Sequence, residues 1–358
     1  MNKRAVVLVV LMHAPAFAFA QSTVTLYGII DAGITYTNNQ GGHSNVMLDT
    51  GILQGNRWGL RGVEDLGGGL KAVFVLENGF NLNNGTLGQG GLLFGRTAYV
   101  GLQSSVAGML TLGRQYDFMY DFMVENSAPA QGSTAVGFHF LDADRMAGEQ
   151  LNNAIKYVTP TMGGVTLGAF YAFSNEAGSF GGTAAAPRAV SFGAKFERGP
   201  LVISGAYTNI DGTSGSLVMS ALKGQSLRTM GIGARYKFNV ATVFGNATNS
   251  RVSNVTGGGN AVINNYEGGG AYDVTPFVRL AGSYTYTTYD GSRYHQFNTA
   301  AHYLFSKATD VYLAVNYQHT NNEATGAGMF LIATPGSFNN FSTTGNQVAV
   351  RVGLRHLF

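Results

Sequence analysis

The chain has 358 residues, of which 11% are charged and none is cysteine. Ordinary globular domains have about 25% charged residues, and the lack of cysteine excludes disulfides and thiolate metal sites. A formal net charge of only +3 argues against nucleic acid as a partner, since nucleic-acid-binding surfaces are strongly basic.

The first twenty residues have the organisation of an export signal. Lys3 and Arg4 form a short positive segment, residues 5–12 are apolar, and Ala18-Phe19-Ala20 has the small-x-small pattern of a cleavage site. The apolar run is too short to cross a bilayer as a helix, which takes about 20 residues. We therefore predict a signal peptide over 1–20, cleavage after Ala20, and a mature domain over 21–358.

The first segment after this signal alternates in hydrophobicity with a period of two. Val24, Leu26 and Ile34 fall on one face, whereas Asp31 and Thr35 fall on the other. The same alternation recurs at 165–174, 310–318 and 347–358. It predicts strands with one apolar and one polar face. Mean hydropathy is only +0.05, and no 18-residue apolar run follows the signal, which excludes a helical membrane protein and favours a closed transmembrane barrel.

Turn-forming segments of two lengths separate these strands and alternate along the chain. The short ones span 65–69, 104–108, 161–164, 198–200 and 306–309, and the long polar ones span 38–44, 83–91, 175–187, 211–225, 252–261 and 321–345. Short turns on one side and long loops on the other are typical of outer-membrane barrels. The fold class predicted is all-β, a transmembrane antiparallel β-barrel of about sixteen strands around an aqueous channel.

The longest connection runs from Asp117 to Gln150 and mixes charged with aromatic residues. Its aromatic residues include Phe118, Phe122, Phe138 and Phe140. Aromatic side chains suit packing against a wall, and a connection of this length is usually functional. We predict that this third extracellular loop folds into the lumen and narrows the pore. The alternative is a mobile extracellular loop.

Motifs spread over essentially the whole chain resemble those of the general porins of β-proteobacteria. They lie at 21–34, 56–71, 94–102, 112–116 and 152–157, and read QSTVTLYGIIDAGI, NRWGLRGVEDLGGGLK, FGRTAYVGL, LGRQY and NNAIKY. The resemblance implies a sixteen-stranded homotrimer in the bacterial outer membrane, in contact with lipid and lipopolysaccharide, with the third loop as its constriction. Phe358 matches the terminal aromatic residue that such barrels present to the outer-membrane assembly machinery.

The resemblance also implies which residues line the constriction. Wall arginines that face the loop in this family carry over to Arg57 and Arg96. Where relatives often have arginine before the Asn-Asn pair, this chain has Gln150, with Arg145 a few residues upstream. The Pro-Glu-Phe-Gly loop motif of some relatives is missing as well. Both departures leave the strength of any anion preference open.

Strand alternation supports part of this assignment without the resemblance. Trp58 and Leu60 take the outward face, so Arg57 and Arg61 turn into the lumen. The Arg96 assignment rests on the resemblance, because apolar residues share its parity. The candidate constriction residues are Arg57, Arg61, Lys71, Arg96, Gln150 and Lys156 on the wall, and Asp121, Glu125, Asp142, Asp144 and Arg145 on the loop. An alternative for the wall arginines is a structural network.

The function predicted is passive diffusion of ions and small hydrophilic solutes, with a mild preference for anions and no cofactor. Asp142, Asp144 and Glu149 have oxygen ligands for Ca²⁺, but their spacing lacks the order of a known calcium loop, so no metal site is predicted. Alternatives are a substrate-specific channel, a barrel enzyme and a plugged adhesive barrel. No H-E-x-x-H, G-x-S-x-G or P-loop motif supports catalysis.

Overall fold

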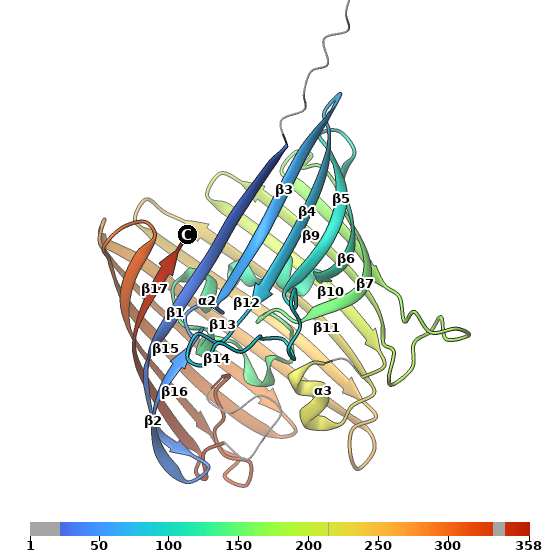
Figure 1. Cartoon of the computed structure of the whole chain (residues 1–358). Coiled ribbons are helices and arrows are strands. Elements are labelled where there is room, and N and C mark those ends of the chain that lie inside the picture. The colour runs from blue at the N-terminus through green and yellow to red at the C-terminus, as the bar shows by residue number, and fades with distance from the viewer. Residues whose placement is uncertain (1–21, 214, 332–340) are drawn as a thin grey trace, which may run out of the picture.

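The computed structural model describes residues 22–213, 215–331 and 341–358. The predicted signal peptide over 1–20, its cleavage site and Gln21 lie outside the described residues. Strands form a continuous wall that encloses several short helices (Figure 1). Among the described helices, none combines the length and the hydrophobicity needed to cross a membrane.

The strands run in chain order around the wall, and each pairs antiparallel with its neighbours. They are β1 (Thr23–Gln40), β2 (His43–Thr50), β3 (Arg57–Gly67), β4 (Leu70–Gly79), β5 (Thr97–Ser104), β6 (Gly108–Tyr116), β7 (Gln150–Val158), β8 (Val165–Ala172), β9 (Arg188–Arg198), β10 (Leu201–Asp211), β11 (Ser226–Lys237), β12 (Ala241–Ser253), β13 (Asn260–Thr275), β14 (Val278–Tyr289), β15 (Ser292–Leu304), β16 (Thr309–Thr320) and β17 (Asn346–Leu357). Pairing of β1 with β17, from Ile29–Leu357 to Thr37–Ala349, closes the barrel. Closure leaves no free sheet edge.

Two of these strands are halves of a single wall strand. β1 pairs with β3 through residues 23–29 and with β2 through residues 32–40. Residues 51–56, which connect β2 with β3, leave the sheet at this point. Counting β2 and β3 as one interrupted strand gives a sixteen-stranded barrel, which confirms the predicted architecture.

The predicted alternation is visible as two faces of the wall. Val24 and Leu26 are 62% and 57% exposed on the outside. Asp31 and Thr35 are 0% and 1% exposed, because they point into a filled interior. Apolar side chains on the outside and polar side chains within are what lipid and an aqueous lumen require.

One predicted long loop is wrong. Within residues 38–44 only Gly41 and Gly42 form the turn, with φ of +61° and +93°, and the rest belongs to β1 and β2. Glycine adopts positive φ without steric cost, so β1 and β2 continue to the turn itself. The remaining long connections are residues 80–96, 117–149, 173–187, 212–225 and 254–259, together with 321–345, of which 332–340 are not described.

The loop of residues 117–149, hereafter the inner loop, follows the inside of the wall. Its short helices are α1 (Phe118–Asp121), η1 (Val124–Asn126), α2 (Ala128–Gln131), η2 (Ala135–Gly137) and η3 (Phe140–Asp142); α3 (Leu217–Leu222) lies in a later loop. α1 packs on β9 and β10, η1 on β11 and β12, α2 on β13 and β14, and η2 on β15. The loop therefore folds inward, as predicted.

Glycines on the wall create room for the start of the inner loop. Gly168 and Gly193 are direct partners on β8 and β9. A Cβ atom at Gly168 would lie 2.1 Å from the ring of Phe118, and one at Gly193 would lie 2.7 Å from Phe118 Cβ. Phe118 is fully buried in an apolar cluster with Phe122. The aromatic rings of Phe118 and Phe122 therefore pack directly against the backbone of Gly168 and Gly193, where no side chain intervenes.

Candidate pore constriction

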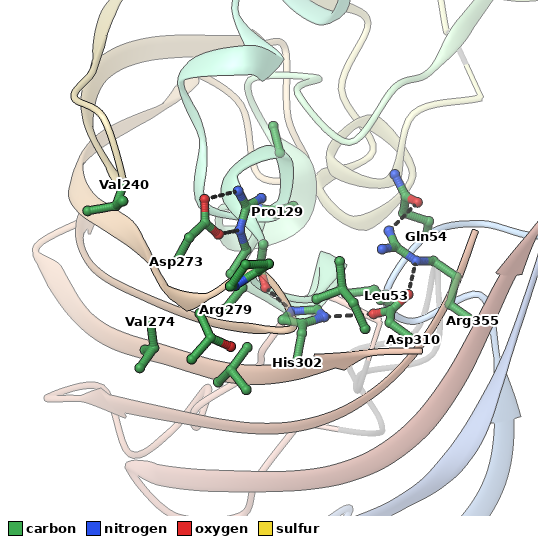
Figure 2. A pocket seen from close by; sticks show the side chains of 16 residues that line it. Leu53, Gln54, Pro129, Val240, Asp273, Val274, Arg279, His302, Asp310 and Arg355 are labelled. Atoms are coloured by element: carbon green, nitrogen blue, oxygen red, sulfur yellow. Dashed lines mark hydrogen bonds and ion pairs between the residues drawn. The ribbon is translucent and has the colours of Figure 1, made fainter. Parts of the chain in front are cut away.

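Among the described residues, two large cavities lie inside the barrel, and a smaller one of about 340 Å³ adjoins the first of them at Gly148 and Phe330. The loop-side cavity, of about 910 Å³, is lined by residues 50–57, by the 80–96 loop and by the inner loop. The turn-side cavity, of about 560 Å³, is lined by residues near the short turns, among them Val240 and Val274 (Figure 2). Leu53, Gln54, Pro129 and Ala130 line both cavities. These four residues, hereafter the neck, lie where the two cavities adjoin.

Asp31 of β1 holds one side of this neck in place. Its Oδ2 accepts a hydrogen bond of 2.7 Å from the backbone N–H of Leu53, and its carbonyl oxygen accepts one of 2.9 Å from the N–H of Gly51. The Asp31 N–H donates to Oδ1 of Asn56. The hydroxyl of Tyr312, on β16, donates to Asp31 Oδ1 over 2.6 Å. The backbone of Asp31 therefore holds both ends of segment 51–56, and its carboxylate holds Leu53 between them.

Segment 51–56 also contacts the inner loop directly. The N–H of Ala135 donates to the carbonyl oxygen of Ile52 over 2.8 Å. Ile52 packs with Val136 of the same loop, and Leu53 packs with Tyr312 on the wall. Sequence reasoning missed this segment. The available signal was the pair Gly51 and Gly55 inside an expected strand, since glycine in a strand often marks an interruption.

Arg57 and Arg96 are the only charged residues that line the loop-side cavity in the described part of the chain. Arg57 Nε donates to the Gly55 carbonyl over 2.9 Å, and the guanidinium makes no ion pair with any described residue. Arg96 Nε lies 2.8 Å from Glu77 Oε1. Arg96 precedes β5, so strand parity does not apply to it and its side chain reaches the lumen.

Other predicted wall residues lie elsewhere. Arg61 lies over the ring of Tyr27, 5.6 Å from its centre, and Lys71 is exposed near the short turn after β3. Neither lines a cavity among those described. Gln150 bonds the Gly148 carbonyl and Arg114, which shares the outward parity of Leu112. Gln150 lines neither the loop-side nor the turn-side cavity, so it lies outside the candidate constriction.

Lys156 and two loop acids form ion pairs between wall and loop. Lys156 pairs with Asp121 and donates to the carbonyl oxygen of Tyr116 over 3.0 Å. Glu125 lies 3.1 Å from Arg235 and 3.6 Å from Lys195. The predicted meeting of loop acids with wall cations occurs here, but each charge is matched by a partner. The pairs attach the loop and leave little net charge for the passage.

Arg145 lies within the inner loop and does not face the passage. It is 1% exposed, and its Nε lies 2.7 Å from Asp117 Oδ2. It also pairs with Glu149, whose Oε1 accepts from the N–H of Leu217 in α3 over 2.9 Å. Burial outweighs the Arg145 pairing and raises the pKa of Glu149. Arg145 thus joins Asp117 and Glu149, which lie at the two ends of the inner loop. The prediction that Arg145 lines the constriction is wrong.

Asp142 and Asp144 are likewise buried, and neither lines the loop-side or the turn-side cavity; Asp142 lines only the smaller cavity beside Glu149. Asp142 is 2% exposed and accepts from the N–H of Ala147 over 2.8 Å; burial and the carboxylates of Glu149 and Asp144 raise its pKa well above the usual value. Asp144 is fully buried and accepts from Thr248 of β12 over 2.7 Å. Both acids stabilise the folded loop. Each accepts hydrogen bonds from buried donors of the protein, and these bonds replace contact with water in the lumen.

His139 connects the loop to the wall through two carboxylates. Its Nδ1 bonds Asp144, and its Nε2 lies 3.4 Å from Glu267 Oε2 on β13. Burial lowers the pKa of this histidine, but the two carboxylates outweigh burial and raise the pKa to about 10. His139 is therefore a cation at neutral pH, and sequence reasoning assigned it no role.

The turn-side cavity contains basic groups that are all paired. His302 Nδ1 and Arg355 Nε each lie 2.8 Å from the carboxylate of Asp310. Arg355 Nη1 also donates to Gln54 Oε1 over 2.7 Å, so Arg355 contacts the neck residue Gln54 from the turn side of the barrel (Figure 2). Arg279 pairs with Asp273 through two hydrogen bonds. Within the described ranges, no group of three or more His, Asp or Glu side chains is arranged to hold a metal ion.

Comparison with known proteins identifies the fold and the family. The family model described as Gram-negative porin matches residues 5–323. An outer membrane porin protein of Bordetella pertussis is 34% identical over 251 residues, which span 62% of this chain and 63% of that relative. Outer membrane porin protein 32 of Delftia acidovorans is 29% identical over 369 residues, covering 99% of this chain and 100% of the relative.

Solved structures agree with these sequence matches. The structure described as an anion-selective porin from Comamonas acidovorans superimposes with a TM-score of 0.79 at 28% identity, covering 94% of this chain and 100% of that one. The closed barrel, the inner loop and the neck are thus seen in a chain whose relatives are outer-membrane porins. The chain belongs to the Gram-negative porin family and forms a channel in the outer membrane.

Proposed function

We propose that the protein lets ions and small hydrophilic solutes diffuse passively across the outer membrane, with a mild preference for anions. The observation that carries this proposal is the charge of the loop-side cavity. Its described lining contains Arg57 and Arg96 and no carboxylate, and Arg57 has no ionic partner. Glu77 offsets Arg96, so the excess is about one positive charge. Low-dielectric walls concentrate the field of such a charge in a narrow space.

Bilayer conductance with a salt gradient tests this proposal. Wild-type protein should give ohmic steps and a reversal potential displaced toward that of the anion. Arg57→Gln should reduce the ratio of anion to cation permeability about two- to five-fold, because it removes the unpaired charge. Arg198→Gln is the matched control, since Arg198 is exposed at the turn end of β9. Absence of conductance in the wild type would overturn the pore, and an unchanged ratio in Arg57→Gln would overturn the selectivity.

A homotrimer is supported by the unequal exterior of the barrel. Up to residue 112, the exposed large apolar side chains are aliphatic apart from Tyr36. Beyond that point many are aromatic; besides the terminal Phe358 next to β1, they are Tyr157, Phe173, Phe180, Phe192, Tyr236, Phe238, Tyr266, Tyr272, Phe277, Tyr284, Phe297, Tyr303 and Phe305. Aromatic belts mark contact with lipid interfaces, whereas an aliphatic surface without a belt suits contact between subunits. Cross-linking from β1 to β5 should yield trimers.

We infer that the C-terminal Phe358 acts in barrel assembly and that residues 1–20 act in export. Phe358 exchanges two backbone hydrogen bonds with Gly28, of 2.9 and 3.1 Å, and its side chain is 50% exposed. That position suits recognition by the assembly machinery before the barrel closes. Residues 1–20 are proposed to be a cleaved signal, for which N-terminal sequencing should begin at Gln21. The proposed transport involves no chemical step, so the protein acts as a channel and not as an enzyme.

A further inference from the structure

Two histidines stand directly opposite each other on the outer face of the barrel, near its loop end. His295 of β15 and His319 of β16 are register partners. Their neighbours Tyr294 and Gln318 are each 1% exposed inside the wall, so both imidazoles project outward. The ring centres lie 6.4 Å apart, and the ring planes are 28° from parallel. Two imidazoles placed in this way are potential ligands of a single metal ion.

Each ring is oriented by a hydrogen bond at its Nδ1 atom. His319 Nδ1 lies 3.0 Å from Oδ1 of Asn346, its register partner on β17, and this oxygen can only accept. The neutral ring of His319 therefore carries its proton on Nδ1, which leaves the lone pair on Nε2. Nδ1 of His295 lies 2.7 Å from the hydroxyl oxygen of Tyr284 on β14. Metal-binding histidines usually have this arrangement, in which a polar partner holds one nitrogen and the other nitrogen binds the ion.

The two Nε2 atoms are available to a ligand from solution. Neither has a hydrogen-bond partner among the described residues, whose histidine ion pairs involve only His139 and His302. An imidazole nitrogen binds Zn²⁺ at about 2.0–2.1 Å, so two rings that share an ion have centres about 5–6 Å apart. His319 is exposed and His295 is half-buried, so rotation of these side chains brings the rings to that spacing.

The histidine pair lies closer to the long loops than the aromatic residues of the same strands. Phe297, 48% exposed, and its register partner Tyr317 form the adjacent outward row on the side of the short turns. An aromatic belt marks the boundary between hydrocarbon and headgroups, so an ion in water can reach the row beyond it. Arg293 is the next outward residue of β15, about 7 Å along the strand from His295 and thus outside the coordination distance.

We propose that His295 and His319 bind one divalent ion of a late first-row transition metal through their Nε2 atoms, with Tyr284 and Asn346 as positioning residues. Imidazole suits Zn²⁺, Ni²⁺ and Cu²⁺, and Cu²⁺ binds most tightly of the three. Two side chains leave coordination positions for water, so the site is open to exchange. The ion links β15 to β16 outside the wall. This site is independent of the diffusion proposed above, which depends on the lumen.

Electron paramagnetic resonance of the purified barrel without an affinity tag, titrated with Cu²⁺ in a non-coordinating buffer, tests the site. Wild-type protein should bind one Cu²⁺ per chain with hyperfine coupling to two imidazole nitrogens. Loss of a partner that orients a ligand costs about 10–100-fold in metal affinity. Tyr284→Phe should therefore weaken binding about ten-fold, and H295Q/H319Q, which removes both ligands, should weaken it further.

Two controls separate this site from other histidines and from the fold. His43→Gln removes an exposed histidine at the start of β2 and should bind Cu²⁺ as the wild type does. Bilayer conductance without metal should be the same in every variant, which shows that the barrel is folded. An excess of Mg²⁺ should not compete, because Mg²⁺ prefers oxygen ligands.

Three results would overturn the proposal. One is equal affinity of H295Q/H319Q and wild type for Cu²⁺. A second is coupling to a single imidazole nitrogen in the wild type, which would mean that the two histidines do not share an ion. The third is a loss of affinity in His43→Gln as large as that in H295Q/H319Q, which would show that Cu²⁺ binds to any exposed histidine.

Discussion

The carboxylate of Asp31 accepts a hydrogen bond of 2.7 Å from the backbone N–H of Leu53, and so fixes a neck residue to the neighbouring strand β1 of the barrel wall. The same carboxylate accepts from Tyr312 over 2.6 Å. The pore is therefore bounded on this side by a segment whose position depends on one acidic side chain, while the inner loop bounds it on the other.

Asp31→Asn should loosen the neck while keeping the shape of the side chain. Leu53 and Tyr312 both donate to this group, and the amide can accept through only one of its two atoms. An unmatched buried donor costs about 1–3 kcal/mol. We expect larger and noisier single-channel currents. Asp65→Asn is the control, because Asp65 is exposed at the turn between β3 and β4, where its carboxylate accepts from the N–H of Gly67. Currents of Asp31→Asn that match those of the control would contradict the proposed clamp.

Glu77→Gln should make the channel more selective for anions. Glu77 accepts from Arg96 over 2.8 Å and from Tyr27 over 2.9 Å. Neutral glutamine at this position leaves Arg96 without an ionic partner beside the loop-side cavity. The reversal potential should shift opposite to that of Arg57→Gln. Glu176→Gln, in the exposed 173–187 loop, should cause no shift. A shift toward cations in Glu77→Gln would show that Arg96 does not act on the passage.

Alkaline pH should release the inner loop from the wall at His139. The folded protein holds the pKa of His139 at about 10, above its usual value of 6.5. A raised pKa stabilises the folded state fully below the unfolded value, and this contribution is lost as pH rises through about 10. The conductance of the wild type should thus change between about pH 8 and 11.

The variant His139→Gln separates this titration from others in the barrel. Asp144 and Glu267 face the histidine, and Thr248 and Asn265 complete its surroundings through Asp144. Glutamine retains hydrogen bonding but carries no titrating charge. Its conductance should already be altered at neutral pH and should lack the alkaline step. An identical alkaline step in variant and wild type would assign the transition to another group.

Gly168→Ala should displace the start of the inner loop into the lumen. The new methyl group would occupy the space of the Phe118 ring, and overpacking of this kind costs about 1–3 kcal/mol. We expect a lower single-channel conductance and a lower melting temperature. Gly205→Ala is the control, because the nearest atom to its Cβ position lies at 3.5 Å. Unchanged conductance together with a lower melting temperature would show that Phe118 adjusts without moving the loop.

Strand alternation and turn length were sufficient to predict the barrel. Both signals are local, since each residue of a strand meets either lipid or lumen regardless of which strand lies beside it. The inward course of the inner loop also followed from a local property, its aromatic residues. Residues 38–44 misled the prediction because polar residues at a strand end resemble a loop, while Gly41 and Gly42 alone set the turn.

Ionic partners could not be predicted in the same way. Arg145 and Arg57 were both candidate pore cations in the sequence, yet Arg145 is buried between Asp117 and Glu149, whereas Arg57 has no ionic partner among the described residues. The distinction depends on the exact path of the inner loop. The Asp31–Tyr312 contact joins residues that only barrel closure brings together. Pairing across such distances is a property of the tertiary structure, not of any local pattern.

The neck and the charged residues lie on different parts of the chain, and this has a consequence for adaptation. Leu53, Gln54, Pro129 and Ala130 are uncharged, whereas Arg57 and Arg96 stand to one side of them. Size cut-off and ionic preference are therefore separate traits that substitutions can alter one at a time. A larger side chain at Ala130 would exclude a bulky toxic compound from the passage. It would leave Arg57 and Arg96 in place, so the uptake of small anionic nutrients would continue.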